Sequence, residues 1–296
     1  SLVRIFEALG VGNGDGLARV AVKISTGEKG NPNHLKAELI GPLVSLVNGK
    51  LVECNTAYAG SRNTPEAHWK TIREHGFTEI APVDIMDEEG DMRIAVKDST
   101  HLKYNIVGKH LAYYDWMINL AHFKGHQMGG FGGVLKNQSI GVASSKGKAY
   151  IHSAGVTDSP DEVWGKLAEQ DDFLESMAAA AQSVHDYFKG NIIYINVMNN
   201  MSIDCDCNGS PAAPCLKDMG IMASLDPVAL DQACADACLK AEPLPNSLLG
   251  DHLSDEHFTD CHDHFKNTTP ESEWETQLSH GEAIGLGSRE YDLIMI

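Results

Sequence analysis

This sequence predicts an α/β fold: a mostly parallel or mixed sheet with helices on both faces. The first observation is that short apolar runs rich in β-branched residues alternate with segments whose apolar residues recur at helical spacing. Such alternation is typical of parallel strands joined by helical crossovers. The second observation is composition, because 43% hydrophobic and 22% charged residues favour a packed core over disorder. We therefore expect one unit over residues 1–296; a division near residue 115 would give two lobes, 1–115 and 116–296.

The first third of the chain contains the clearest alternation. Pro65 suits the first turn of a helix and Gly76 suits its C-terminal cap, so residues 65–75 are predicted to be helical. Leucines recur at helical spacing over residues 35–46, with Pro42 as a kink or boundary. Strands are predicted over residues 1–6, 18–25, 50–54 and 78–83.

The remainder of the chain continues the pattern. Asp226 is placed to cap a helix over residues 227–240. Further helices are predicted near residues 161–188 and 274–284, and strands at 116–120, 191–198 and 291–296.

The charge and hydropathy of the chain exclude several classes of partner. The formal net charge is -18, which disfavours nucleic acid and anionic membrane surfaces, because both are bound by clustered Lys and Arg. No apolar run reaches the roughly 18–20 residues that a membrane span needs. The N-terminal residues do not resemble a signal peptide, so we expect a soluble cytoplasmic protein; the sequence indicates no protein partner.

A glycine-rich stretch over residues 122–137 is the most informative segment. It lies within residues 116–157, which contain no Asp or Glu although the chain has 41. Backbone N–H groups exposed by glycines, with nearby lysines, are suited to holding a carboxylate or phosphate. We predict that His126, Lys124 and Lys136 hold and polarise a small anionic ligand, as catalytic residues if there is a reaction. The anion-binding set is Gly129, Gly130, Gly132, Gly133, Asn137, Lys148 and His152. The alternative is a glycine-rich connection that only packs tightly.

Cysteines provide the second candidate site. Seven cysteines, an odd number, disfavour a disulfide framework and leave thiols for metal or redox chemistry. Cys205, Cys207 and Cys215 follow a predicted strand, where the loops of an open α/β sheet form the ligand crevice. Three thiolates could bind a zinc-type metal ion or three corners of an iron–sulfur cluster. We expect Cys205, Cys207 and His126 to lie in one pocket; the alternative is three buried or idle thiols.

The other thiols and histidines have simpler interpretations. Cys234 and Cys238 share one face of a predicted helix, which favours a place in the core, and Cys54 at a strand end is more often structural. A polar segment resembles a metal-binding tract, but its spacing favours a solvated loop; it contains His252, His257, Cys261, His262 and His264.

Several of these segments also carry a family likeness. The relevant stretches are Val22-Lys23, Asn55-Thr56-Ala57-Tyr58, Lys124-Gly125-His126, Gly132 to Asn137, Gly147-Lys148, Cys205-Asp206-Cys207, Ala223 to Ala229 and Gly285 to Tyr291. In this order the chain resembles the DUF362 family, a group of uncharacterised proteins named for iron–sulfur centres. Many members carry a ferredoxin-like insert, but residues 153–190 contain no cysteine, so the chain resembles a member without it.

Two classes of function follow. The first is a metal-dependent enzyme or redox protein, with a metal ion or iron–sulfur cluster on the thiolates and a small anionic ligand beside it. The second is a non-catalytic anion-binding protein with a structural metal.

Overall fold

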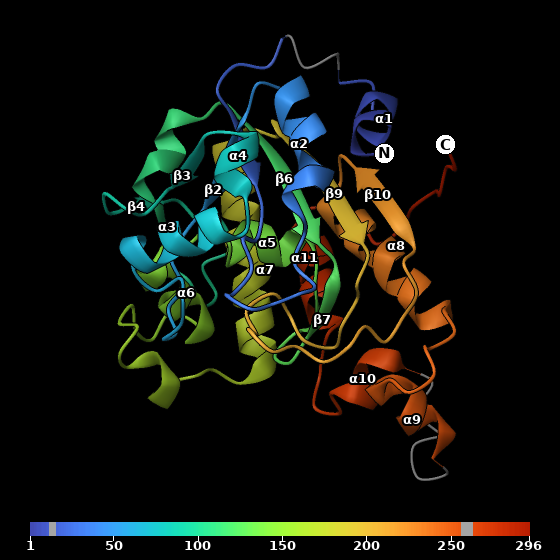
Figure 1. Ribbon diagram of the computed structural model, residues 1–296. Coiled ribbons are helices and arrows are strands. Elements are labelled where there is room, and N and C mark those ends of the chain that lie inside the picture. Colours follow the sequence, from blue (N-terminus) through green and yellow to red (C-terminus); the bar gives the residue numbers. More distant parts are fainter. Residues whose placement is uncertain (12–15, 256–262) are drawn as a thin grey trace.

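The computed structural model describes residues 1–11, 16–255 and 263–296. Its centre is a six-stranded sheet in the order β10-β9-β6-β1-β2-β3, in which every neighbouring pair is parallel except β10 with β9 (Figure 1). The strands are β1 (Val20–Lys23), β2 (Lys50–Glu53), β3 (Val83–Ile85), β6 (Trp116–His122), β9 (Ile192–Met198) and β10 (Gly220–Ser224). The mixed sheet confirms the predicted fold class, and it includes strands from both sides of residue 115.

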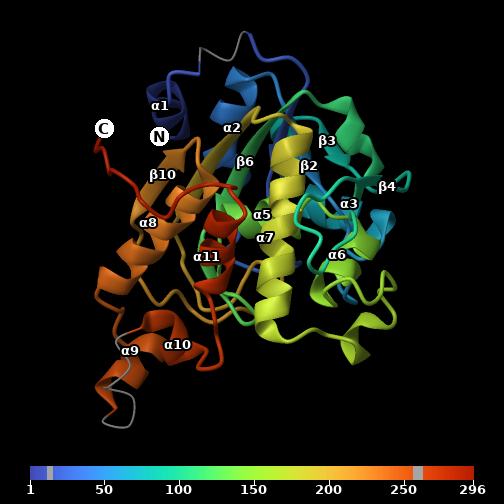
Figure 2. The same cartoon turned by 180° about the vertical axis from the view of Figure 1, so that it is seen from behind.

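Helices cover both faces of this sheet, as predicted (Figures 1 and 2). Alternate residues of the central strands point to opposite faces, so Met117 and Ala121 of β6 join one apolar core while Ile118 and Leu120 join the other. One core packs against α1 (Leu2–Ala8), α2 (Ala37–Leu46), α3 (Pro65–Glu74) and α4 (Phe77–Ile80). The opposite core packs against α5 (Val134–Ser139), α7 (Gln170–Tyr187), α8 (Pro227–Lys240) and α11 (Thr276–Ala283).

Smaller elements complete the chain. Two hairpins lie outside the main sheet, β4 (Asp91–Ile94) with β5 (Asn105–Gly108), and β7 (Lys124–His126) with β8 (Gly130–Gly132). The remaining helices are α6 (Ser145–His152), α9 (Leu248–Ser254), α10 (His264–Thr268) and the 3₁₀ turns η1 (Lys109–Tyr113) and η2 (Val163–Gly165). Across the described ranges, no helix combines the length and the apolar composition needed to cross a membrane.

Three predicted strands differ from the structure. Residues 1–6 belong to helix α1, where Leu2 and Phe6, four apart, bury one face and Ser1 accepts the N–H of Arg4 as a cap. The interval 78–83 divides between α4, which ends at Ile80, and β3, which begins at Val83. Residues 291–296 form no strand and expose their apolar side chains, because no neighbouring strand pairs with them.

Candidate functional site

A cavity of about 570 Å³ opens at the carboxyl ends of the parallel strands. Lys23 is the last residue of β1 and Glu53 the last residue of β2, and both line it. The segments that follow β6 and β9 supply the rest of the wall, including Lys124 and Cys207. The crevice therefore lies where the topology of an open α/β sheet places ligand sites, and its volume suits a small molecule.

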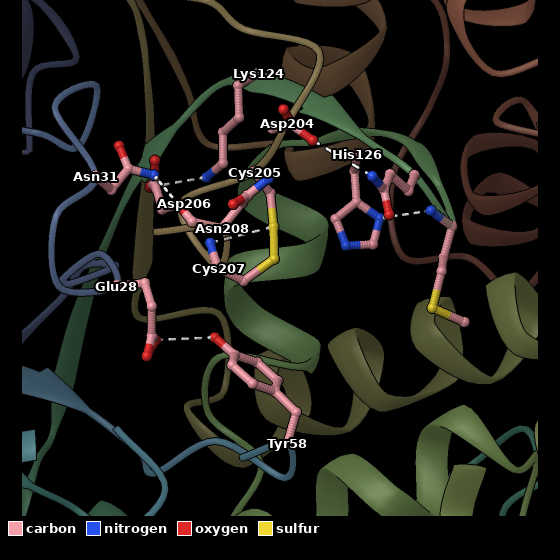
Figure 3. The surroundings of a disulfide bond; sticks show 12 residues. Glu28, Asn31, Tyr58, Lys124, His126, Asp204, Cys205, Asp206, Cys207 and Asn208 are labelled. Atoms are coloured by element: carbon pink, nitrogen blue, oxygen red, sulfur yellow. Dashed lines mark hydrogen bonds and ion pairs between the residues drawn. A yellow bond between two sulfur atoms is a disulfide. The ribbon is translucent and has the colours of Figure 1, made fainter. Parts of the chain in front are cut away.

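Acidic and basic side chains pair with one another along the wall formed by the first third of the chain. Glu53 accepts from Lys23 at 2.7 Å and lies 3.7 Å from Arg62, while Arg62 donates to Glu28 at 3.0 Å. Burial alone would raise the pKa of Glu53, but Lys23 and Arg62 outweigh it and hold the pKa at about 2. Tyr58 donates to Glu28 on the same wall (Figure 3). Sequence reasoning missed this network as part of the site; charged residues directly at the end of apolar strands were the signal.

Asp206 fixes the cysteine-bearing loop to the rest of the cavity. Its side chain accepts from His122 at 2.8 Å and from Lys124 at 3.1 Å, and its backbone carbonyl accepts the N–H of Glu28 at 2.8 Å. Burial would raise the pKa of Asp206, but His122 and Lys124 hold it far below the usual range. The carboxylate of Asp206 therefore largely compensates the positive charge of Lys124.

Cys205 and Cys207, on either side of Asp206, form a disulfide in the cavity wall (Figure 3). The prediction that the thiols are reduced was wrong for this pair, because an odd number of cysteines does not prevent one local bond. Their Cα atoms are 5.2 Å apart, within the range that a disulfide spans. Cys205 is buried while Cys207 is half-buried, and both line the cavity.

Cys215 lies apart from this pair. Its thiol donates to the carbonyl of Met201 and borders a second cavity of about 30 Å³, shared with Cys238. Burial raises the pKa of Cys215 to about 11. The expected set of Cys205, Cys207 and Cys215 is therefore not brought together. Together with His126 the two thiols would supply three protein ligands, one fewer than the four that an iron–sulfur cluster usually takes from the protein.

A different set of metal-type side chains does come together. One ring nitrogen of His126 and the sulfur atoms of Cys205 and Cys207 all lie within 4.8 Å of one another. The expectation that these three residues share a pocket is confirmed. Reduction of the disulfide would leave two thiolates and an imidazole, a donor set that fits a single zinc-type ion with an open position.

His126 carries its proton on the Nε2 atom. Its Nδ1 atom accepts backbone N–H groups of Met128 at 3.2 Å and Gly129 at 3.1 Å, so the neutral ring keeps its proton on the other nitrogen. Burial, followed by the charge of Lys136, lowers the pKa of His126 well below its ordinary value. The ring is thus a neutral N–H donor at the cavity.

Lys136 differs from the other cations of the cavity. Among the described residues its side-chain amine has no hydrogen-bond or ion-pair partner, whereas the amine of Lys148, for example, donates to the carbonyl of Ala143 at 2.6 Å. A Cβ atom on Gly132 would lie 3.1 Å from the Lys136 side chain and 3.9 Å from both Lys136 Nζ and Lys124 Cε, so the two lysines converge over this glycine. Burial and the neighbouring Lys124 lower the pKa of Lys136 to about 7.

Some predicted anion-binding residues line the cavity and others do not. Gly132, Gly133, Asn137, Lys148 and His152 are part of its wall. The side chain of Asn137 donates to the carbonyl of Lys23, and burial lowers the pKa of His152 to about 4.

Gly129 and Gly130 are not part of the cavity wall. A Cβ atom on Gly130 would overlap Trp274, so its lack of a side chain serves close packing. The carbonyl of Gly129 accepts from Gln277.

The other cysteines and histidines agree largely with their simpler interpretations. Cys234 and Cys238 lie on the buried face of α8, in the core, as predicted. Cys54 borders the cavity, but its thiol donates to the carbonyl of Val142. The prediction of a solvated loop was wrong in part, because His252 lies on α9 and His264 begins α10, and both are half-buried and hydrogen-bonded. His257, Cys261 and His262 lie outside the described residues.

Comparisons with known proteins identify one family and distant structural likenesses. A family model described as "Domain of unknown function (DUF362)" matches residues 20–236. No curated protein matches the chain. Among solved structures, the lactate racemase apoprotein from Thermoanaerobacterium thermosaccharolyticum is similar with a TM-score of 0.44 and 14% identity, over 65% of this chain and 47% of that chain. We take nothing about chemistry from so distant a likeness.

Proposed function

This chain belongs to the DUF362 family of unknown function, and from the geometry of its cavity we propose that it is a redox protein that binds a small anionic ligand beside a reactive Cys205–Cys207 pair. The observation that carries the proposal is a disulfide in the wall of the same cavity as Lys136, a lysine whose amine forms no hydrogen bond or ion pair with the described residues. An anion that enters would supply the missing partner of Lys136.

The acids of the cavity support an anionic ligand. Each carboxylate that lines it already accepts from the protein: Glu28 from Arg62, Glu53 from Lys23, Asp204 from Gln127 and the N–H of Ala212, and Asp206 from Lys124. None of them is left to neutralise Lys136. The uncompensated charge is therefore positive in a protein whose formal net charge is -18.

The chemistry assigned to the thiols is a two-electron exchange. Conversion of the two thiols to the disulfide transfers two electrons and two protons to an acceptor, and a thiol reductant reverses the step. Cys207 is the less buried residue of the pair, so its sulfur is the one that we expect a reductant to attack, and the lysines that line the same cavity would favour a thiolate there.

The test equilibrates oxygen-free protein with defined ratios of reduced and oxidised glutathione and labels free thiols with iodoacetamide for peptide mass spectrometry. Cys205 and Cys207 should gain label together as the buffer becomes more reducing, while the buried Cys54, Cys215, Cys234 and Cys238 stay protected. A pair that never forms a disulfide, or that remains oxidised in excess dithiothreitol, would contradict the proposal.

A metal site on the same residues is the second candidate, because His126, Cys205 and Cys207 lie so close together. One observation counts against it. A metal-bound histidine usually donates its second N–H to an acceptor, whereas Nδ1 of His126 itself accepts two backbone N–H groups. Elemental analysis of reduced protein decides: stoichiometric zinc that is lost in Cys207→Ser and His126→Asn would favour the metal over the redox pair.

A further inference from the structure

We propose that the amine of Lys136 forms an imine with the carbonyl group of a small keto acid bound in the cavity. The proposal rests on the anion-binding role argued above and adds to it a substrate class and a covalent step. Its basis is the position of one amine that no described residue contacts by a hydrogen bond or ion pair, among cavity cations that each have such a partner.

The partners of the other cations show why Lys136 is distinct. Lys23 donates to Glu53, Arg62 to Glu28 and Lys124 to Asp206. Each of these three cations therefore has an acidic partner. The Lys136 nitrogen faces the cavity without such a contact among the described residues, so it is free to react.

A neighbouring cation and burial favour the neutral amine. Lys124 converges with Lys136 over Gly132, and the depressed pKa of Lys136 means that part of the population is unprotonated near neutral pH. A desolvated lysine beside another cation is a recognised arrangement for attack on carbonyl carbon. Lys124 and the protonated fraction of Lys136 supply attraction for the carboxylate of the incoming molecule.

The step balances without an external oxidant or reductant. The lone pair of the Lys136 nitrogen forms a bond to the carbonyl carbon, and the electrons of the C=O bond move to oxygen. The two amine protons leave with that oxygen as water, and a C=N bond remains. The Nε2 proton of His126 is the neutral donor at the cavity available to assist loss of the oxygen.

Apolar side chains complete the recognition. Ile140, Val163, Trp164 and Leu167 line the same cavity. They suit the carbon chain of a keto acid better than the fully polar surface of inorganic phosphate.

The experiment treats the whole protein at pH 7 with pyruvate and sodium cyanoborohydride, which converts an imine into a stable secondary amine. Peptide mass spectrometry should find one carboxyethyl group on Lys136, at a yield more than about tenfold above that of any exposed lysine, because more of this amine is unprotonated. Acetone, which lacks the carboxylate, should label Lys136 weakly, and lactate, which lacks the carbonyl, should not label it.

Two variants sharpen the outcome. Lys136→Arg keeps the charge but cannot form an imine, so the adduct should disappear while pyruvate binding, measured by calorimetry, persists. In Lys124→Arg the adduct on Lys136 should remain. If a variant fails to fold, the positions labelled in the unmutated protein, identified by peptide mass spectrometry, still test the proposal.

The failures of the two proposals can be told apart. Pyruvate binding without an adduct on Lys136, or label spread evenly over exposed lysines, would overturn the imine while leaving the anion site intact. Absence of both binding and adduct, with inorganic phosphate and sulfate also failing to bind, would remove the anion site and the imine together.

Discussion

The two walls of the cavity use charge in opposite ways. On the wall from the first third of the chain, Lys23, Glu53, Arg62 and Glu28 pair with one another. On the opposite wall Asp206 forms an ion pair with Lys124, whereas Lys136 forms no ion pair with the residues that the structure describes. Paired buried charges hold the strand ends in place, whereas an unpaired one costs stability and is retained where it can act on a ligand.

The largest expected loss of stability comes from a substitution on the wall where acidic and basic side chains pair. Glu53→Gln leaves Lys23 and Arg62 without their shared carboxylate and should lower the free energy of unfolding by about 3–5 kcal/mol, measured by urea denaturation. Glu38→Gln, an exposed glutamate near the start of α2, is the matched control and should change it by less than about 0.5 kcal/mol. Equal effects of the two variants would mean that the buried network does not hold this wall.

Glu53→Gln should also change how the free energy of unfolding depends on pH in acid, the acid limb of the stability curve. The pKa of Glu53 falls from 4.5 to about 2 on folding, so its contribution is present above pH 4.5 and is lost as the pH falls toward 2. Glu53→Gln should therefore flatten the loss of stability in this window. An unchanged acid limb would contradict the low pKa.

On the wall that contains Lys136, removal of the charge should raise the free energy of unfolding instead of lowering it. The pKa of Lys136 falls from 10.5 to about 7 on folding, so the folded protein bears a cost for its protonation at low pH. Lys136→Met should raise the free energy of unfolding at pH 6 by on the order of 1–2 kcal/mol, and the gain should shrink as the pH rises toward 10. The control is Lys70→Met on the exposed face of α3, which should show no such pH dependence. Destabilisation at pH 6 would mean that Lys136 has a partner after all.

The smallest effect concerns the disulfide. Reduction with dithiothreitol should lower the free energy of unfolding by about 1–2 kcal/mol, because the loop between Cys205 and Cys207 is very short. Cys207→Ser should remove this dependence on reductant. Cys234→Ala, in the core, should destabilise equally with and without dithiothreitol. If dithiothreitol leaves the free energy of unfolding of the unmutated protein unchanged, Cys205 and Cys207 do not form a disulfide in solution.

The sequence by itself determined the elements whose signals are local. Thr64 and Pro65 start α3 and Gly76, at φ 77°, follows its end; Asp226 caps α8 through the N–H groups of Val228 and Ala229. The apolar run of β9 is buried throughout its length and is paired on both sides. These elements, and the place of ligand crevices at parallel strand ends, follow from short-range preferences and known topology.

Strand pairing, the grouping of the cysteines and the charge pairs of the cavity were decided only by the tertiary structure, because they depend on contacts between residues distant in the sequence. An apolar run becomes a strand only where a partner strand lies beside it, so residues 291–296 remain unpaired. Cys205 bonds Cys207 while Cys215 faces another cavity, although the sequence presents all three as one set. Lys124 and Lys136 look equivalent in the sequence. Asp206, 82 residues from Lys124, forms an ion pair with that lysine, while the amine of Lys136 has no such partner in the part of the chain that the structure describes.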